Sequence, residues 1–91
     1  MEPKLIAVEE CCTNYNIEFT FLESLNDFGL IEIVLLENNR FLPEDQLKDL
    51  ERMIRLHYEL DINMAGIDAI SHLLKRMHDL QEEIRVLRNN T

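Results

Sequence analysis

The chain has 91 residues, of which 46% are hydrophobic, and it contains only two glycines and two prolines. This length suits a single domain with one buried core, and the composition argues against a disordered tail or linker. The formal net charge is −9, from 18 acidic and 9 basic residues. A protein of that charge repels nucleic-acid phosphates and anionic lipid, so neither is expected as a partner.

The acidic residues are concentrated in the N-terminal half. Residues 5–39 contain no Lys or Arg, whereas from Arg40 onward eight bases accompany ten acids. A single surface acid commonly serves solubility alone. A long stretch without any base instead predicts an anionic surface, which suits a basic protein partner.

Neither a secretory leader nor a membrane span is expected, because no segment approaches the roughly 20 apolar residues that a span needs. The two cysteines, Cys11 and Cys12, are neighbours. Adjacent residues of a helix point about 100° apart, so a bond between them is not expected. These observations favour a cytoplasmic protein with reduced core thiols.

The first expected element is a helix from about Ala7 to Tyr15, whose apolar residues follow the spacing of one buried face. That face carries Val8, Cys11, Cys12 and Tyr15. A second helix is expected from Glu18 to Phe28, with Gly29 placed for a left-handed helix end. Its buried face carries Phe21, Leu22, Leu25 and Phe28.

Residues 30–42, LIEIVLLENNRFL, predict a small hairpin wing whose turn is at Asn38-Asn39, a pair that tolerates positive φ. Both faces of its first strand carry apolar residues, with Ile31, Ile33 and Leu35 on one face and Val34 and Leu36 on the other.

A third helix is expected to open at Pro43, in the first turn, and to reach about Glu59. Its core stripe consists of Leu47, Leu50, Ile54 and Tyr58, widened by Met53, Leu56 and Leu60.

A long last helix is expected over residues 64–91 of a single domain 1–91, with Asn63 as its N-cap. Its apolar residues keep a heptad spacing for almost three heptads. We call this set the α-helical seam: Ile70, Leu73, Met77, Leu80, Ile84 and Leu87. The seam could pack along its own domain, but its final turns lie too far from a small core. Pairing with a second copy is therefore the favoured interpretation, with the helix orientation left open.

The sequence predicts no catalytic, metal or cofactor site. His72 and His78 are six residues apart, which turns them about 120° from a common face, and His57 belongs to another helix. The cysteine pair lacks the spacing of a metal-binding knuckle. Two glycines cannot build a phosphate-binding loop. A non-enzymatic protein is expected.

The order of these elements, together with FGLIE (28–32), IRLHYELDINMAGIDAI (54–70) and DLQEEIRVLRNN (79–90), resembles the MerR-type winged helix-turn-helix. The chain is more closely similar to the CbpM family of chaperone modulators. The resemblance implies a mostly helical fold of four helices with a small wing and a long C-terminal helix. In the MerR pattern a basic and aromatic run precedes the helix-closing glycine, but Glu23, Ser24 and Leu25 stand there in this chain.

Similarity to the modulator family implies a protein partner. Members bind the J-domain of a DnaJ/CbpA-type co-chaperone and inhibit its action with Hsp70 by covering its basic Hsp70-binding helix. The residues expected to contact the J-domain are Glu9, Glu10, Asn14, Glu18, Glu23 and Asp27. The alternative is a MerR-type DNA-binding transcriptional regulator, which would use Arg40, Lys48, Arg52 and Arg55.

Overall fold

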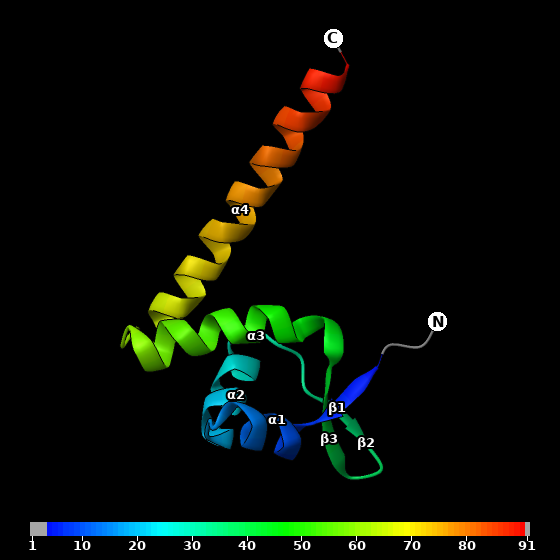
Figure 1. The fold of residues 1–91 in the computed structure, drawn as a ribbon, viewed down its shortest axis with the longest axis vertical. Coiled ribbons are helices and arrows are strands. Elements are labelled where there is room, and N and C mark those ends of the chain that lie inside the picture. The colour runs from blue at the N-terminus through cyan, green and yellow to red at the C-terminus, as the bar shows by residue number, and fades with distance from the viewer. Residues whose placement is uncertain (1–3, 91) are drawn as a thin grey trace.

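The computed structural model describes residues 4–90, and the outermost residues of the predicted domain, 1–3 and 91, lie outside that range. The described part is mostly helical and confirms the expected winged helix-turn-helix with a long C-terminal helix (Figure 1). Its elements are β1 (Leu5–Ala7), α1 (Val8–Tyr15), α2 (Phe19–Asp27), β2 (Val34–Leu36), β3 (Asn39–Pro43), a 3₁₀ turn (Glu44–Gln46), α3 (Leu47–Ile54), a π-helical segment (Arg55–Glu59) and α4 (Met64–Asn89).

The wing is a three-stranded antiparallel sheet in the order β1-β3-β2. Its hairpin turn is at Glu37 and Asn38, with φ of 50° and 67°, so the turn predicted at Asn38-Asn39 is wrong by one residue. The pairing of Val34 with Phe41 and of Leu36 with Asn39 leaves two residues for the turn, and positive φ at both is the geometry that matches strand twist. Strand β1 was not predicted, and it shortens the first helix, which begins at Val8 instead of Ala7.

The core lies where α1, α2, α3 and the base of α4 meet the sheet. In Figure 1, α3 crosses above α1 and α2, and α4 rises from its far end. Four different elements supply side chains with no exposed surface: Leu22 and Leu25 from α2, Leu42 from β3, Leu50 from α3 and Ile67 from α4. Burial of each such side chain stabilises the fold by about 1.5–3 kcal/mol, so the core joins all of these elements into one unit.

Two apolar side chains near chain turns are exposed, and one of them, Phe28, was predicted on a buried face. Phe28 is 46% exposed because α2 ends at Asp27 and the chain then turns through Gly29, whose φ is 74°. Leu35 is 69% exposed, although its predicted face-mate Ile31 is buried. The reason is that β2 begins only at Val34, so Ile31 precedes the strand and does not share its alternation.

The third helical region runs to Glu59 as predicted, but it is not one regular helix. Pro43 is the last residue of β3 and does not occupy a helical first turn. Leu50 and Met53 are buried, whereas Tyr58 and Leu60, both predicted in the core, are 44% and 63% exposed. The π-helical turns of residues 55–59 are wider than α-helical turns, so Tyr58 leaves the face that Leu50 and Met53 share, although Leu56 still packs against the core.

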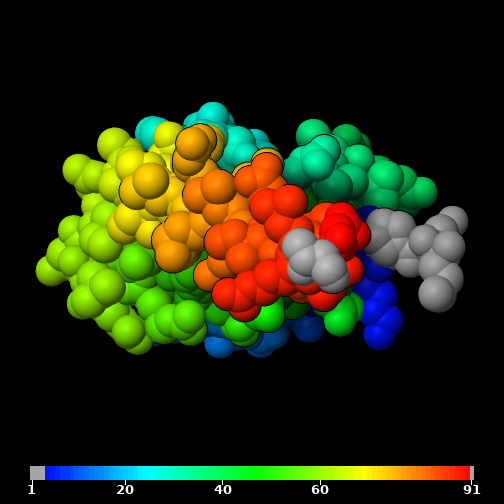
Figure 2. Space-filling view, turned by 90° about the horizontal axis from the view of Figure 1, so that it is seen from above, coloured from blue at the N-terminus to red at the C-terminus, as the bar shows by residue number. Residues whose placement is uncertain are grey.

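Helix α4 begins with the predicted cap and then leaves the body. The Asn63 side-chain oxygen accepts the Gly66 backbone N–H at 2.8 Å. The described chain measures 52 × 37 × 21 Å, and Figure 2 looks down on it with the C-terminal part of α4 nearest the viewer. Among the seam residues only Ile70 is half-buried. The interpretation that the seam packs along its own domain is therefore wrong.

Candidate functional site

The helix-turn-helix is formed by α1, a three-residue turn and α2. Asn16 closes α1 in the left-handed region, with φ 54° and ψ 51°, a conformation that Asn tolerates better than most residues. The Ile17 backbone N–H then donates to the Cys12 carbonyl at 3.0 Å, and the Ile17 side chain is buried. This turn fixes α2 with one face in the core and the opposite face in solvent.

The outer face of α2 is acidic. Thr20, Glu23 and Asp27 are all exposed, and their spacing of three and four residues places them on one side of the helix. Neither acid forms an ion pair within residues 4–90, so both carboxylates are available to a partner. In a helix-turn-helix this is the face that would enter a DNA groove, and it presents negative charge.

The other four predicted contact residues are distributed over α1 and the start of α2. Glu10 and Asn14 are exposed and share a face of α1 by their four-residue spacing. Glu18 lies at the start of α2, where its carboxylate accepts the Thr20 hydroxyl at 3.3 Å. The predicted set therefore divides between two helices, with its strongest pair on α2.

The remaining predicted acid, Glu9, is already paired. Arg40 of β3 donates to its carboxylate at 3.2 Å and also lies 3.9 Å from the centre of the Phe19 ring. Hydrogen bonds from its own backbone N–H and from Arg40 hold the pKa of Glu9 below its usual value. Arg40 thus joins the wing to α1 and α2, and it is occupied by protein groups where the DNA-binding alternative needs it for phosphate.

An exposed leucine extends this surface, and sequence reasoning missed it. Leu35 pairs directly with Arg40 across the hairpin, so the two side chains lie on the same face of the sheet. Leu35 therefore stands beside the Arg40, Glu9 and Phe19 contact with 69% of its surface exposed. The available signal was the first wing strand, which carries apolar residues on both faces although only one face can enter the core.

The helix-turn-helix and its wing agree with the comparison to known families. The family model described as "MerR HTH family regulatory protein" matches residues 6–89. The chain belongs to this MerR family. Domains of the family are regulatory and in general non-enzymatic. No curated protein and no solved structure matches the chain.

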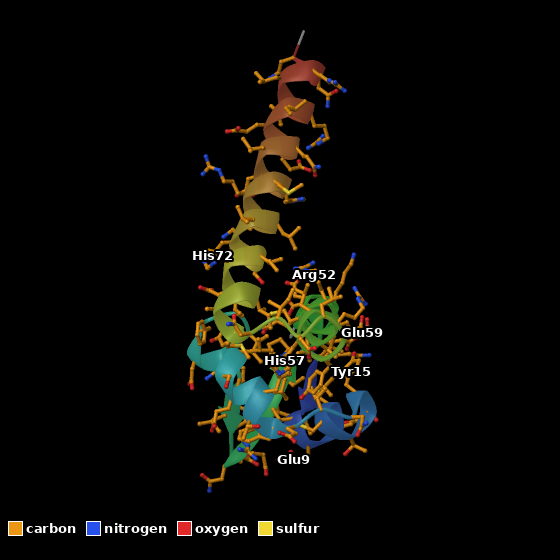
Figure 3. The ribbon with its side chains drawn as sticks, turned by 90° about the vertical axis from the view of Figure 1, so that its left-hand side faces the viewer. Glu9, Tyr15, Arg52, His57, Glu59 and His72 are labelled. Atoms are coloured by element: carbon orange, nitrogen blue, oxygen red, sulfur yellow. The ribbon has the colours of Figure 1, made fainter. Side chains whose placement is uncertain are left out.

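His57 and the two cysteines of the MerR-family chain occupy structural positions, whereas His72 and His78 are exposed on α4. His57 stacks on Phe21 with ring centres 4.8 Å apart, and its Nδ1 lies 3.0 Å from the Ile62 carbonyl. Figure 3 shows His57 at the body and His72 on α4, well away from it. Cys11 and Cys12 are free, and burial raises the pKa of both thiols, which makes them less reactive. Residues 4–90 contain no group of three or more ligands that could hold a metal ion.

The seam of the MerR-family chain is exposed over most of its length. Five of its side chains have exposed fractions between 46% and 66%: Leu73, Met77, Leu80, Ile84 and Leu87. Val86, which lies off the seam, is also 47% exposed. A continuous apolar stripe of this kind on a polar helix is typical of helix–helix association.

Within residues 4–90, none of the helices combines the length and the apolar character that a membrane span requires.

Two of the bases that the DNA-binding alternative would use face away from α2. Lys48 and Arg52 line a recess between α3 and α4, and Figure 3 shows Arg52 on the upper side of α3, where α4 rises. Arg52 also donates to the Asp49 carboxylate at 3.1 Å. These bases are not part of the surface that α2 and the wing present.

Proposed function

We propose that this chain is a cytoplasmic, non-enzymatic modulator that binds the J-domain of a DnaJ/CbpA-type co-chaperone. By covering the basic Hsp70-binding helix of that domain, it inhibits the co-chaperone's action with Hsp70. The observation that supports the proposal most strongly is the outer face of α2, where Glu23 and Asp27 are exposed and form no ion pair within residues 4–90. A basic helix is the complementary partner for such a face.

The apolar part of the surface supports a protein partner over a purely electrostatic one. Protein interfaces combine a desolvated apolar centre with a polar rim. Leu35, beside the Arg40 and Phe19 contact, offers the apolar contribution, and Glu9, the ion-pair partner of Arg40, offers an acid next to it. The acids would then contribute mainly association rate and selectivity, and Leu35 the desolvated contact.

We further propose that the modulator acts as a homodimer through the seam on α4. Leaving this stripe in water forgoes about 0.8–1.5 kcal/mol for each half-exposed side chain. A two-fold pair of α4 helices would cover the same residues of both copies at once. The acidic face of α2 lies on the body and not on α4, so the dimer would present two such faces.

The test is calorimetric binding of the full chain to a J-domain. We expect the substitution E23K/D27K to lower the affinity by about tenfold or more, because it replaces two attractions to a basic helix by repulsions. The control E59K/D79K makes the same change in net charge at exposed acids on other elements, and its affinity should stay within about twofold of the wild type.

Three results would contradict the proposal. They are no binding to the J-domain, equal binding to a J-domain whose basic helix has been neutralised, and equal weakening by E59K/D79K. Titration with duplex DNA at low salt, where phosphate contacts are strongest, tests the alternative. We expect no binding there, and saturable binding would favour the transcriptional regulator.

A further inference from the structure

A basic recess lies between α3 and α4, where the two helices diverge. Its volume is about 530 Å³, within the range of small-molecule sites. Three of the chain's nine Lys and Arg residues line it: Lys48 and Arg52 from α3 and Lys75 from α4. The one acid in its wall is Asp49, and His78 adds a further nitrogen donor. With His78 neutral, the wall carries a net charge of about +2 by formal count.

This gathering of bases is opposed by their own repulsion. Only Arg52 of the three forms an ion pair, with Asp49 at 3.1 Å, within the described part of the chain. The chain as a whole has a net charge of −9, yet only one of its 18 acids, Asp49, lines the recess. Like charges held together in a concave site raise the local potential and favour a bound anion.

Two buried polar atoms belong to residues that line the recess and have no hydrogen-bond partner within residues 4–90. Among residues 4–90, the buried side-chain N and O atoms left without a hydrogen bond are Arg52 Nε and Ser71 Oγ. They come from α3 and α4, the two helices that form the recess. Buried polar groups are almost always hydrogen-bonded, so residues from both walls of the recess retain unused hydrogen-bonding capacity.

The rest of the wall is apolar. Leu30 enters from the segment after α2, Met53 from α3 and Leu74 from α4. Met53 is also a buried core residue. A ligand that fills the recess therefore needs an apolar body as well as a charged head.

We propose that the recess binds a phosphate monoester with a small apolar body. A phosphate monoester carries about two negative charges at neutral pH and several acceptor oxygens. These match the excess of two positive charges and the N–H donors of Lys48, Arg52 and Lys75, while the body would lie on Leu30, Met53 and Leu74. Such a ligand would tie α3 to α4 and so hold the angle at which α4 leaves the body. The inference does not depend on J-domain binding.

The experiment is a titration of the ¹⁵N-labelled full chain with phenyl phosphate, followed by amide chemical shifts. We expect saturable shifts at Leu30, in α3 and in the first half of α4, with a Kd on the order of 1 mM, as for ligands of this size. Benzoate, with the same body and a single charge, should bind several-fold more weakly. Inorganic phosphate lacks the apolar body and phenol lacks the charged head, so both should also bind several-fold more weakly than phenyl phosphate.

Variants separate the site from general electrostatics. R52Q/K75Q should weaken phenyl phosphate by about tenfold or more, whereas R55Q/R85Q removes the same charge outside the recess and should change the Kd less than about twofold. Ser71→Ala removes one unpartnered donor with little threat to folding and should weaken binding by about threefold. Absence of localised shifts, benzoate or inorganic phosphate binding as tightly as phenyl phosphate, or equal weakening by both double variants would overturn the proposal.

Discussion

The double substitution L80K/I84K should convert the proposed dimer into a monomer. These side chains are 46% and 52% exposed in the single chain, so each leaves about half of its burial free energy unused, roughly 0.7–1.6 kcal/mol. Four such side chains across a dimer are worth about 3–6 kcal/mol. Losing them should raise the dimer Kd by about 10²- to 10⁴-fold, before the added cost of placing lysines in the contact.

Light scattering or sedimentation equilibrium measures the mass of the particle directly at chain concentrations of roughly 1 μM to 1 mM. As dissociation constants, these concentrations correspond to binding free energies of about 8 to 4 kcal/mol. The wild type should approach twice the chain mass of 10.8 kDa, and L80K/I84K should stay near that mass. The control V86K/N89K adds the same charge off the seam, to a half-exposed valine and an exposed asparagine, and should remain dimeric. A monomeric wild type, or an unchanged mass for L80K/I84K, would refute the reasoning.

Three further predictions concern the body and the base of α4. Burial first, and then the hydrogen bond to Glu51 at 2.9 Å, raise the pKa of Tyr15 to about 12, above its ordinary value near 10. The unfolded chain therefore loses that proton first, so the wild-type free energy of unfolding should fall between pH 10 and 12 more steeply than that of Tyr15→Phe; parallel denaturation curves for the two would contradict this. Asn63→Ala removes the cap of α4 and should cost about 1 kcal/mol in urea unfolding, and Asn63→Asp, which retains the acceptor, serves as the control. Gly66→Ala places a Cβ 2.6 Å from Cγ2 of the stiff, β-branched Ile62, and this clash should outweigh the gain in helix propensity and lower the melting temperature; a rise would contradict it.

The helices were predictable because their information is local. The spacing of Phe21, Leu22 and Leu25 identifies the buried face of α2 within one stretch of sequence, and all three are buried. Asn63 was recognisable as a cap from its place before a periodic run. Strand β1 was not recognisable, because Leu5–Ala7 becomes a strand only by pairing with β3, more than thirty residues away. The hairpin turn was placed one residue late because two asparagines appeared better suited to positive φ than Glu37, and pairing across the wing decided otherwise.

The candidate surfaces likewise divide into those that follow local helix periodicity and those that depend on contacts between distant segments. The acids of α2 and the seam of α4 follow helix periodicity, so their exposure could be predicted from the sequence. The ion pair of Glu9 with Arg40 and the exposed Leu35 depend on the wing meeting α1, which no local pattern contains. The basic recess combines Lys48 and Arg52 with residues more than twenty positions later. Only the angle between α3 and α4 brings those groups together.

The arrangement of charge gives the molecule an electric dipole moment. Helices α1 and α2, which carry exposed acids, lie below α3 in Figure 1, whereas Lys48, Arg52 and Lys75 line the recess between α3 and α4. In this field a cationic partner and the chain would turn relative to each other before contact. The partner would then approach α2 and not the basic recess of the chain. Since the Debye length is about 10 Å at 0.1 M salt and shorter above that, the orienting effect would act only over the last few water layers. The association rate should therefore depend on ionic strength far more than the dissociation rate does.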